Sequence, residues 1–437
     1  MEEGGAMRVL VTGAAGFIGR HIVAALRAGG HRIVCAGRDV ERIRRMFPDQ
    51  ESLTCDFNRD VTAERWLPHL AGIHAVVNCV GILQPRRGQS MAAVHGAAPK
   101  ALFDACARAR VRRVVQISAL GIGPDIALEY SRSKLDADRH LESLDVDWVI
   151  LRPSLAYTPA GSFGGTSLFR ALAALPWIVP LVGDGRQQFQ PIHMSDLAET
   201  VRRLVEDSRI SRQLINVVGP EPMALRDILA GLREWLGYAA PRFVETPPKV
   251  VRLVARIADW LGGGPVTTTA LTMLQAGNTA DPAPFMAATG IVPRRFADAL
   301  ASEPAHVQDR WHARLYFLRP LLRVAIGLFW LFTGLTTLVL WPHVDSLRML
   351  RESGVPDVLL PVAFHLGWAL DVALGIAALV RYRVALVGSV MIGVTVVYLA
   401  FLSVGQPWQW IHPITPLAIC IPLAVATLVM MAIDDDR

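Results

Sequence analysis

The feature that most constrains the fold of this chain is a glycine-rich stretch near its start, VLVTGAAGFIG at residues 9–19. An apolar run typical of a buried strand leads into a turn and then into an apolar helix. Gly13 permits the tight turn, Gly16 lets a phosphate approach the backbone, and Gly19 lets the helix lie close to the strand. The helix N-terminus offers unpaired N–H groups to a pyrophosphate. The spacing is GxxGxxG rather than GxGxxG, and an ordinary glycine-rich turn is the alternative to nucleotide binding.

Regular alternation of strand and helix patterns follows this turn. Near-continuous Val and Ile runs indicate parallel strands that are covered on both faces, so we expect an α/β fold, a Rossmann-type doubly wound sheet. After Pro153 the pattern loosens into loops, as in a small substrate lobe, and a strand at 191–194 leads into a helix capped by Ser195 or Asp196. The expected strands are 31–36, 53–57, 74–80, 113–118 and 147–152, and the expected helices 92–108 and 130–144.

The apolar residues are unevenly distributed. They make up 52% of the 437 residues and dominate the chain after Leu318. Each apolar segment there, with its flanks, is long enough to cross a hydrocarbon core of about 30 Å. We therefore predict a nucleotide-binding domain over 7–305 followed by an all-α four-helix transmembrane domain over 306–437. The four predicted spans are 324–340, 358–380, 384–404 and 411–433.

Arginine placement predicts the orientation of these spans. Arginines precede the first span, Arg381 and Arg383 join the second span to the third, and the third-to-fourth connection is uncharged. By the positive-inside rule, the nucleotide-binding domain and the C-terminus are cytoplasmic, in a multi-pass protein of the inner or plasma membrane. The acidic N-terminus predicts no signal peptide.

Charge and cysteine content exclude some functions. The net charge of +6 is carried by scattered arginines without interleaved aromatics, which argues against nucleic-acid binding. The five cysteines lack metal-ligand spacing, so no metal site is expected. The predicted partners are a small-molecule substrate, a lipid bilayer and a membrane redox partner.

Tyr130 and Lys134 are the first candidates for catalysis. Four residues apart on a helix, they share one face, and an ammonium beside a phenol is expected to lower the phenol pKa. Ser118 ends a strand at the sheet edge where ligands bind in such folds. A YxxxK pattern alone is more often a solvated pair, but here it follows a nucleotide motif in the required order.

These motifs carry a family resemblance. Residues 7 to about 300 resemble the extended and atypical short-chain dehydrogenase/reductases, and within them the branch of the nucleotide-binding accessory subunit of respiratory complex I. The C-terminal region resembles a DoxX-like four-helix membrane domain in topology and length. The matching segments are TGAAGFIG at 12–19, Ser118, YSRSK at 130–134, LRPS at 151–154 and PIHMSDL at 191–197.

The resemblance implies a bound NAD(P) and specific roles. Tyr130 would be the general acid/base, Lys134 would hold the nicotinamide ribose, and Ser118 would orient the substrate. The chain departs from the family pattern at His95, where an asparagine is common, and at Thr158, where a glycine is common. The expected cofactor contacts are Gly13, Gly16, Phe17, Ile18, Gly19, Arg38, Asp56 at the adenine, Asn78, Gly81, Lys134 and Pro153.

The end of the second strand predicts the choice of cofactor. NAD-binding sites place a carboxylate there against the ribose 2′-hydroxyl. This chain has Gly37 followed by Arg38, which favours the 2′-phosphate of NADP. Asp39, one residue further, leaves NAD as the alternative.

Two further features bear on the membrane. The segment 248–261 is a basic amphipathic helix that would lie on a membrane surface or pack against the soluble lobe. His365 and Asp371 are ionisable residues within a predicted span, where such groups are costly. They are functional candidates, or each faces the bundle interior and bonds a neighbour such as Thr333, Thr336 or Thr337.

Three functions remain open. The first is a membrane-anchored NAD(P)-dependent oxidoreductase or epimerase-like enzyme for a lipophilic or quinone-related substrate. The second is a non-catalytic NAD(P)H-binding sensor or assembly factor for a membrane redox complex. In the third, the helical domain is a redox module that works separately from the nucleotide-binding domain in the same chain.

Overall fold

The computed structural model describes residues 6–82, 88–124, 128–260, 268–276, 278–340, 343–413 and 415–434. The chain divides into two compact units, Met1–Ala313 and Arg314–Arg437. Each unit has its own apolar core, and each is described by itself.

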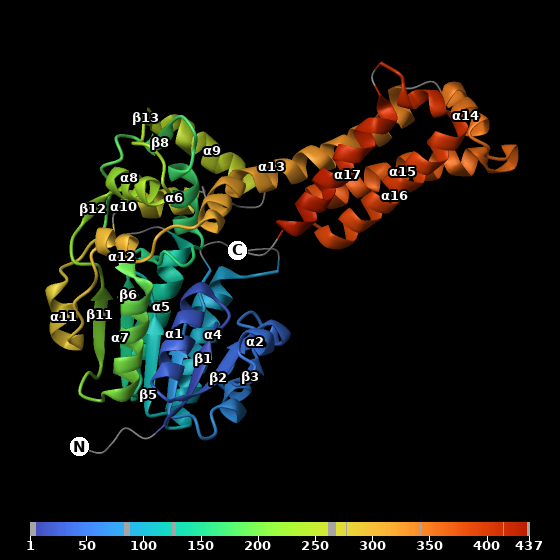
Figure 1. Cartoon of the computed structure of the whole chain (residues 1–437). Helices are drawn as coiled ribbons and strands as arrows, with labels where there is room; N and C mark the ends of the chain where they lie inside the picture. The colour runs from blue at the N-terminus through green and yellow to red at the C-terminus, as the bar shows by residue number, and fades with distance from the viewer. Residues whose placement is uncertain are drawn as a thin grey trace. The chain divides into compact units, whose positions relative to one another are not determined.

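A seven-stranded parallel sheet forms the centre of the first unit (Figure 1). The strand order is β11-β6-β5-β4-β1-β2-β3, so the chain runs outward from β1 in one direction and then returns to build the other half. The sequence pattern had not indicated β11. The strands are β1 Arg8–Thr12, β2 Arg32–Gly37, β3 Glu51–Thr54, β4 Ala75–Asn78, β5 Arg113–Ile117, β6 Trp148–Pro153 and β11 Gln213–Val217.

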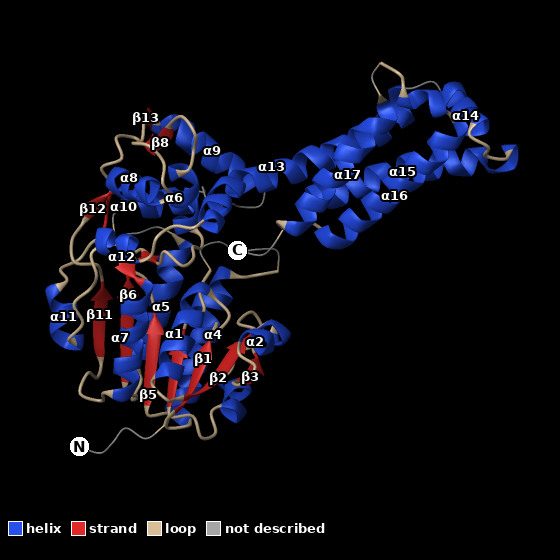
Figure 2. Ribbon diagram, in the orientation of Figure 1, coloured by secondary structure: helices blue, strands red, loops and turns tan. Residues whose placement is uncertain are grey.

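Helices cover both faces of this sheet, as a doubly wound fold requires (Figure 2). One core includes residues of α1, α2, α7 and α11, and the other includes residues of α3, α4 and α5. Fully buried Val and Ile side chains of the strands contribute to both cores. The helices are α1 Phe17–Ala28, α2 Val40–Met46, α3 Ala63–Trp66, α4 Ala98–Arg108, α5 Glu129–Ser143, α7 Met194–Glu206 and α11 Ala283–Thr289.

The helix expected over 92–108 is present and includes a π-helical turn, Ala93–Ala97, directly ahead of α4. One local expectation was wrong. The N-cap of α7 is His193 rather than Ser195 or Asp196, because the His193 ring accepts a hydrogen bond from the Ser195 N–H at 3.3 Å. Extended backbone at His193 allows its ring to reach that N–H.

A small lobe with a separate apolar core follows β6 in the chain. It contains three short strand pairs, of which the parallel pair of β8 and β13 is the longest. The lobe elements are β7 Ala156–Tyr157, α6 Gly165–Ala173, β8 Val179–Val182, β9 Gln188–Phe189, β10 Ile192–His193, β12 Met223–Ala224, α8 Leu225–Trp235, β13 Phe243–Thr246, α9 Pro248–Trp260, α10 Thr268–Ala276 and α12 Phe296–Ser302.

The second unit is helical. Among the described residues, three stretches are long and apolar enough to cross a membrane, Val307–Leu340, Asp357–Leu379 and Val384–Gly405, and a fourth apolar helix has 17 residues. The fourth helix starts later than expected, after a short 3₁₀ turn, and α14 occupies part of the connection between the first two predicted spans. The helices are α13 Val307–Leu335, extended by a π-helical stretch Thr336–Leu340, α14 His343–Glu352, α15 Leu360–Leu379, α16 Val384–Gly405 and α17 Pro416–Ala432.

Ion pairs join α13, the α15–α16 connection and the end of α17. The Asp434 carboxylate lies 3.2 Å from the Arg381 guanidinium and 3.9 Å from that of Arg319. The polar part of α13, the α15–α16 connection and the end of α17 therefore lie at one end of the bundle.

The two ionisable residues of α15 have partners other than those expected. Asp371 is buried and accepts a hydrogen bond from the Tyr398 hydroxyl of α16 at 3.4 Å. His365 is exposed and accepts from the Trp368 indole N–H at 3.2 Å. The expectation that a threonine of the first span bonds them is replaced by these contacts.

Candidate nucleotide and catalytic site

The glycine turn between β1 and α1 leaves no room for side chains. Gly13 has φ +70°, and a Cβ there would lie 3.1 Å from the backbone of Cys79 on the neighbouring strand end. A Cβ on Gly19 would lie 2.2 Å from the Gly13 carbonyl oxygen, and one on Gly16 would lie 3.0 Å from it. Gly16 also supplies no side-chain cap for α1. The open N-terminus of this helix fits a phosphate group.

Phe17 and Ile18, the first residues of α1, are half-buried. The Phe17 ring stacks on Phe163 with a centroid distance of 6.1 Å. Phe163 belongs to the loop before α6, so this stack connects the nucleotide turn to the small lobe. The sequence offered no signal for Phe163.

Asn78 holds three strand ends together. Its Oδ1 accepts from the Thr12 hydroxyl at 2.6 Å, and its Nδ2 donates to the Gln116 oxygen at 2.7 Å. Asn78 is fully buried, so its side chain is committed to β1 and β5. The Asn78 side chain is therefore not available to a cofactor. Within residues 78–81, a cofactor would contact the backbone or the residues after Asn78.

Arg38 is exposed at the end of β2. The Gln89 amide, with its oxygen toward Arg38, accepts from both terminal guanidinium nitrogens at 2.5 and 3.0 Å. The neighbouring Asp39 carboxylate accepts from the Arg42 N–H at 2.9 Å and caps α2. The Asp39 carboxylate therefore caps a helix. The sequence pattern alone could not tell whether it does this or faces a ribose.

Two more arginines stand near the same strand end. Arg20 donates to the carbonyls of Ala15 and Gly16, each at 3.3 Å, and so lies over the glycine turn. Burial and then the charge of Arg42 lower the pKa of Arg20. The sequence analysis missed Arg20 and Arg42, because only the tertiary fold brings α1 and α2 together here.

Asp56 follows β3 at the same edge of the sheet. Its Oδ1 accepts from the backbone N–H and the side-chain amide of Asn58 at 3.0 and 3.1 Å. These bonds fix the carboxylate and leave Asp56 partly exposed.

Tyr130 and Lys134 share one face of α5, as their spacing predicted. The Lys134 Nζ lies 5.9 Å from the Tyr130 ring centroid and donates to the Ile117 carbonyl at 3.3 Å. Burial lowers the Lys134 pKa to about 8, opposed by the charge of Asp138. The expectation of a lowered tyrosine pKa was wrong, because burial and then the Asp138 charge raise the pKa of Tyr130.

His95 packs against the catalytic candidates from the π-helical turn. Its ring meets the Tyr130 ring edge-to-face at 5.3 Å, and its Nε2 lies 2.8 Å from the Ile82 carbonyl oxygen. Burial lowers the His95 pKa to about 3, so the imidazole is neutral. A Cβ on Gly81 would lie 3.5 Å from this ring and 3.7 Å from the Lys134 Nζ, so Gly81 keeps the space beside both groups open.

Ser118 is bound to a buried acid. Its hydroxyl donates to Asp138 Oδ2 at 2.7 Å, and Arg152 donates to the same oxygen at 3.1 Å. Asp138 is fully buried, and burial raises its pKa. The sequence analysis missed Asp138, although its position four residues after Lys134 on the same helix face was an available signal.

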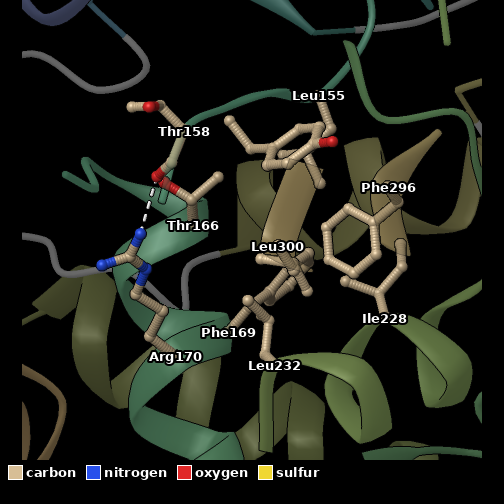
Figure 3. Close-up of a pocket in the computed structure, with 10 residues that line it drawn as sticks. Leu155, Thr158, Thr166, Phe169, Arg170, Ile228, Leu232, Phe296 and Leu300 are labelled. Atoms are coloured by element: carbon tan, nitrogen blue, oxygen red, sulfur yellow. Dashed lines mark hydrogen bonds between the residues drawn. The ribbon is translucent and has the colours of Figure 1, made fainter. Parts of the chain in front are cut away.

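Pro153 ends β6, and a small pocket begins two residues beyond it (Figure 3). Apolar side chains form most of the wall, and the Arg170 guanidinium lies at one side, where it donates to the Thr158 carbonyl at 2.6 Å. The lining residues are Leu155, Tyr157, Thr158, Thr166, Phe169, Arg170, Ile228, Leu232, Phe296 and Leu300.

Two family models match parts of the chain. Residues 13–164 match the NAD(P)H-binding family, and residues 327–428 match the DoxX-like family. The chain therefore combines an NAD(P)H-binding Rossmann domain of the epimerase and short-chain dehydrogenase type with a DoxX-like domain. The first match contains the glycine turn, Arg38, Tyr130 and Lys134.

Curated relatives of the NAD(P)H-binding domain are distant. The 40 kDa subunit of NADH-ubiquinone oxidoreductase from Neurospora crassa is 24% identical over 57% of this chain and 65% of its own length, just under two thirds. Ceramide reductase of Caulobacter vibrioides is 26% identical over 58% of this chain and 78% of its own. Among solved structures, the UDP-N-acetylglucosamine 4-epimerase of Bacillus cereus superposes with a TM-score of 0.51, at 16% identity, over 68% of this chain and 95% of its own. The superposition shows a shared fold.

The residues of the NAD(P)H-binding domain fit a dinucleotide. Gly13 has a positive φ, and a Cβ on Gly19 would meet the Gly13 carbonyl, so the chain keeps this turn free of side chains at the helix N-terminus, where a phosphate would bind. The space beside Gly81, next to the Lys134 ammonium, lies at the carboxyl edge of the same sheet, where such folds bind ligands.

Proposed function

We propose that this protein is a membrane-anchored, NADPH-dependent oxidoreductase for a lipophilic substrate, with Tyr130 as general acid. The observation that carries the proposal is the packing at the end of β5. A buried lysine, a half-buried tyrosine and the open space at Gly81 meet there, next to a glycine cradle that fits a dinucleotide.

The raised pKa of Tyr130 gives the direction of proton transfer. A tyrosine that stays protonated at neutral pH is a donor, so Tyr130 would give its proton to the oxygen of a carbonyl-type substrate. When bound, NADPH supplies the hydride that goes to the adjacent carbon, and the two additions convert the carbonyl to an alcohol. Lys134 would hold ribose hydroxyls and stabilise the phenolate that remains.

Cofactor choice in this proposal follows the charges at the end of β2. Arg38 is exposed there, and Arg20 and Arg42 lie near the adjoining turns. The Asp39 carboxylate, which would favour NAD, is held by the Arg42 N–H. A 2′-phosphate beside these guanidinium groups would form charge-assisted hydrogen bonds, so NADP is preferred over NAD.

The proposed substrate class follows from the pocket lining and one relative, and the proposed membrane placement follows from the arginine pattern. The pocket after Pro153 has mostly apolar walls, and one relative is named a ceramide reductase, which favours a lipophilic substrate. The arginine pattern supports a cytoplasmic NAD(P)H-binding domain and a cytoplasmic C-terminus. Arg319 and Arg381 both pair with Asp434 at one end of the helical unit. A topology of four spans supports this arrangement, since it brings the three residues to the same side of the membrane.

The test measures NADPH oxidation by membranes containing the full chain, with a panel of quinones and long-chain carbonyl compounds. Tyr130→Phe should reduce turnover by roughly 10²-fold or more, because the proton donor is lost, while NADPH binding persists. Ser133→Ala is the matched control, since Ser133 is half-buried on the same helix and, among the described residues, its hydroxyl bonds backbone carbonyls. Equal turnover in Tyr130→Phe and the unsubstituted protein would remove the enzymatic proposal.

A second candidate function is nucleotide-dependent assembly or sensing without turnover. Ser118 favours it, because its hydroxyl is bound to Asp138 instead of being free for a substrate. The relative from Neurospora crassa, named as a subunit of an oxidoreductase, agrees with it. NADPH binding without oxidation of any panel compound would support this function.

A further inference from the structure

The small lobe exposes a group of large apolar side chains around β8, β13 and α9, which Figure 1 shows together at one end of the lobe. Trp177, two residues before the start of β8, is 83% exposed, and Leu253 of α9 is 58% exposed. Val244 on β13 and Val250 and Val254 on α9 are also exposed. We call this group, with Ile178, the α9 face. Large apolar side chains that are exposed together on one surface mark an interaction site.

Strand pairing makes the α9 face continuous. The register of the parallel pair places Val244 opposite Pro180, two residues after Ile178. Pro247 then connects β13 directly to the first turn of α9, where the Val250 N–H donates to the Pro247 carbonyl at 2.9 Å. The loop before β8, the strand β13 and the helix α9 thus form one surface.

The helical period divides α9 into three sectors. Val251 and Ala255 are buried, so this sector anchors the helix on the lobe. At 100° per residue, Leu253 lies opposite the buried sector, with Val250 and Val254 on one flank. The basic residues Lys249, Arg252 and Arg256 lie on the other flank, and all three are exposed.

The charge beside the apolar side chains is strongly positive. Within the described parts of the chain, no acidic side chain pairs with Lys249, Arg252, Arg256 or Arg242, the residue before β13. The nearest acidic residues in sequence are Glu245, which is exposed, and Asp259, whose side chain lies outside the described residues, so these four basic residues outnumber the acids around them. An apolar sector flanked by a net positive charge matches the interface of an anionic bilayer, where apolar groups insert and cations meet phosphates.

We propose that the α9 face docks on the surface of an anionic lipid bilayer. The same chain carries apolar helices long enough to cross a membrane, so a bilayer is an expected partner of this chain. Docking would hold the pocket after Pro153 near the lipid phase. The inference concerns a surface and does not depend on turnover at Tyr130.

The experiment uses the full chain in nanodiscs of phosphatidylcholine alone or mixed with phosphatidylglycerol. Leu253→Cys carries an environment-sensitive NBD label, and doxyl-labelled lipid acts as the quencher. Ser208→Cys, an exposed position after α7, is the control, and the unsubstituted protein treated identically corrects for reaction at native cysteines. We expect blue-shifted emission and severalfold stronger quenching at 253 than at 208, in anionic nanodiscs only, and a loss of this difference at high salt.

Charge variants complete the test. The triple substitution Lys249→Gln, Arg252→Gln and Arg256→Gln should reduce quenching at 253 to the level in neutral nanodiscs. Replacing the exposed Arg108, Arg110 and Arg112 by Gln should leave it unchanged. Equal quenching in both lipids would overturn the proposal. So would a label exposed to water in every nanodisc.

Discussion

The Lys134 ammonium lies 5.9 Å from the centroid of the Tyr130 ring, but its hydrogen bond at 3.3 Å goes to the Ile117 carbonyl. The two side chains are neighbours without being a hydrogen-bonded pair. The charge of Lys134 therefore does not lower the pKa of Tyr130, because burial raises that pKa. This arrangement leaves tyrosine as a proton donor and lysine as a titratable cation at slightly alkaline pH.

The affinity for NADPH should fall as pH rises through 8. Burial lowers the Lys134 pKa to about 8, so the protonated fraction falls above that pH, and with it the ammonium that holds ribose hydroxyls. Between pH 7 and pH 9 the dissociation constant should rise roughly tenfold. Fluorescence titration measures it. Lys134→Met should bind more weakly and without this pH dependence, and a flat profile in the unsubstituted protein would contradict the proposed role.

Arg38→Ala should discriminate between the two cofactors. Loss of a charge-assisted hydrogen bond to a 2′-phosphate costs about 1.5–3 kcal/mol, so NADPH affinity should fall by roughly 10- to 100-fold. NADH affinity should change less than about twofold, since NADH lacks that phosphate. Arg45→Ala is the control because Arg45 is exposed on α2 and bonds only a backbone carbonyl. Parallel losses for both nucleotides would count against an NADP site.

Gly19→Ala should disrupt the glycine turn. The added Cβ would lie 2.2 Å from the Gly13 carbonyl oxygen, so α1 must move away from β1. We expect about 1–3 kcal/mol of lost stability and loss of NADPH binding. Gly165→Ala, where a Cβ meets no atom within 4 Å, should preserve both. Melting curves with and without NADPH measure the two effects, and normal binding by Gly19→Ala would refute the packing argument.

Asp138 and Asp136 allow a matched comparison on α5. Asp138→Ala leaves the half-buried Arg152 guanidinium without its counter-charge and should cost about 3–5 kcal/mol. Asp136 pairs with Lys100 at the surface, where its side chain is 62% exposed, and Asp136→Ala should stay within about 0.5 kcal/mol. Denaturant unfolding of both variants provides the measurement. Similar losses of unfolding free energy in the two variants would show that the burial of Asp138 does not make its ion pair more important for stability than the exposed pair.

Local patterns were sufficient for much of the fold. The run before Gly13 and the period of the helix after it are short-range signals, so β1, α1 and α5 lie close to their expected positions. The weak pattern of β11 was missed, because Gln213 and Leu214 are exposed and the strand depends on pairing with β6. The cap of α7 was assigned wrongly for a related reason, since the His193 ring competes with the usual capping residues.

The sequence by itself determined the parts of this protein that depend on spacing along one element. The glycine turn, the Tyr130 and Lys134 face and the apolar segments after Leu318 are of this kind, because helix and strand geometry repeat over a few residues. Only the tertiary structure decided which groups are buried together. The tertiary contacts bind Ser118 to Asp138, raise the pKa of Tyr130 and bring Arg20 of α1 near Arg42 of α2, since hydrogen bonds and desolvation depend on contacts between distant segments.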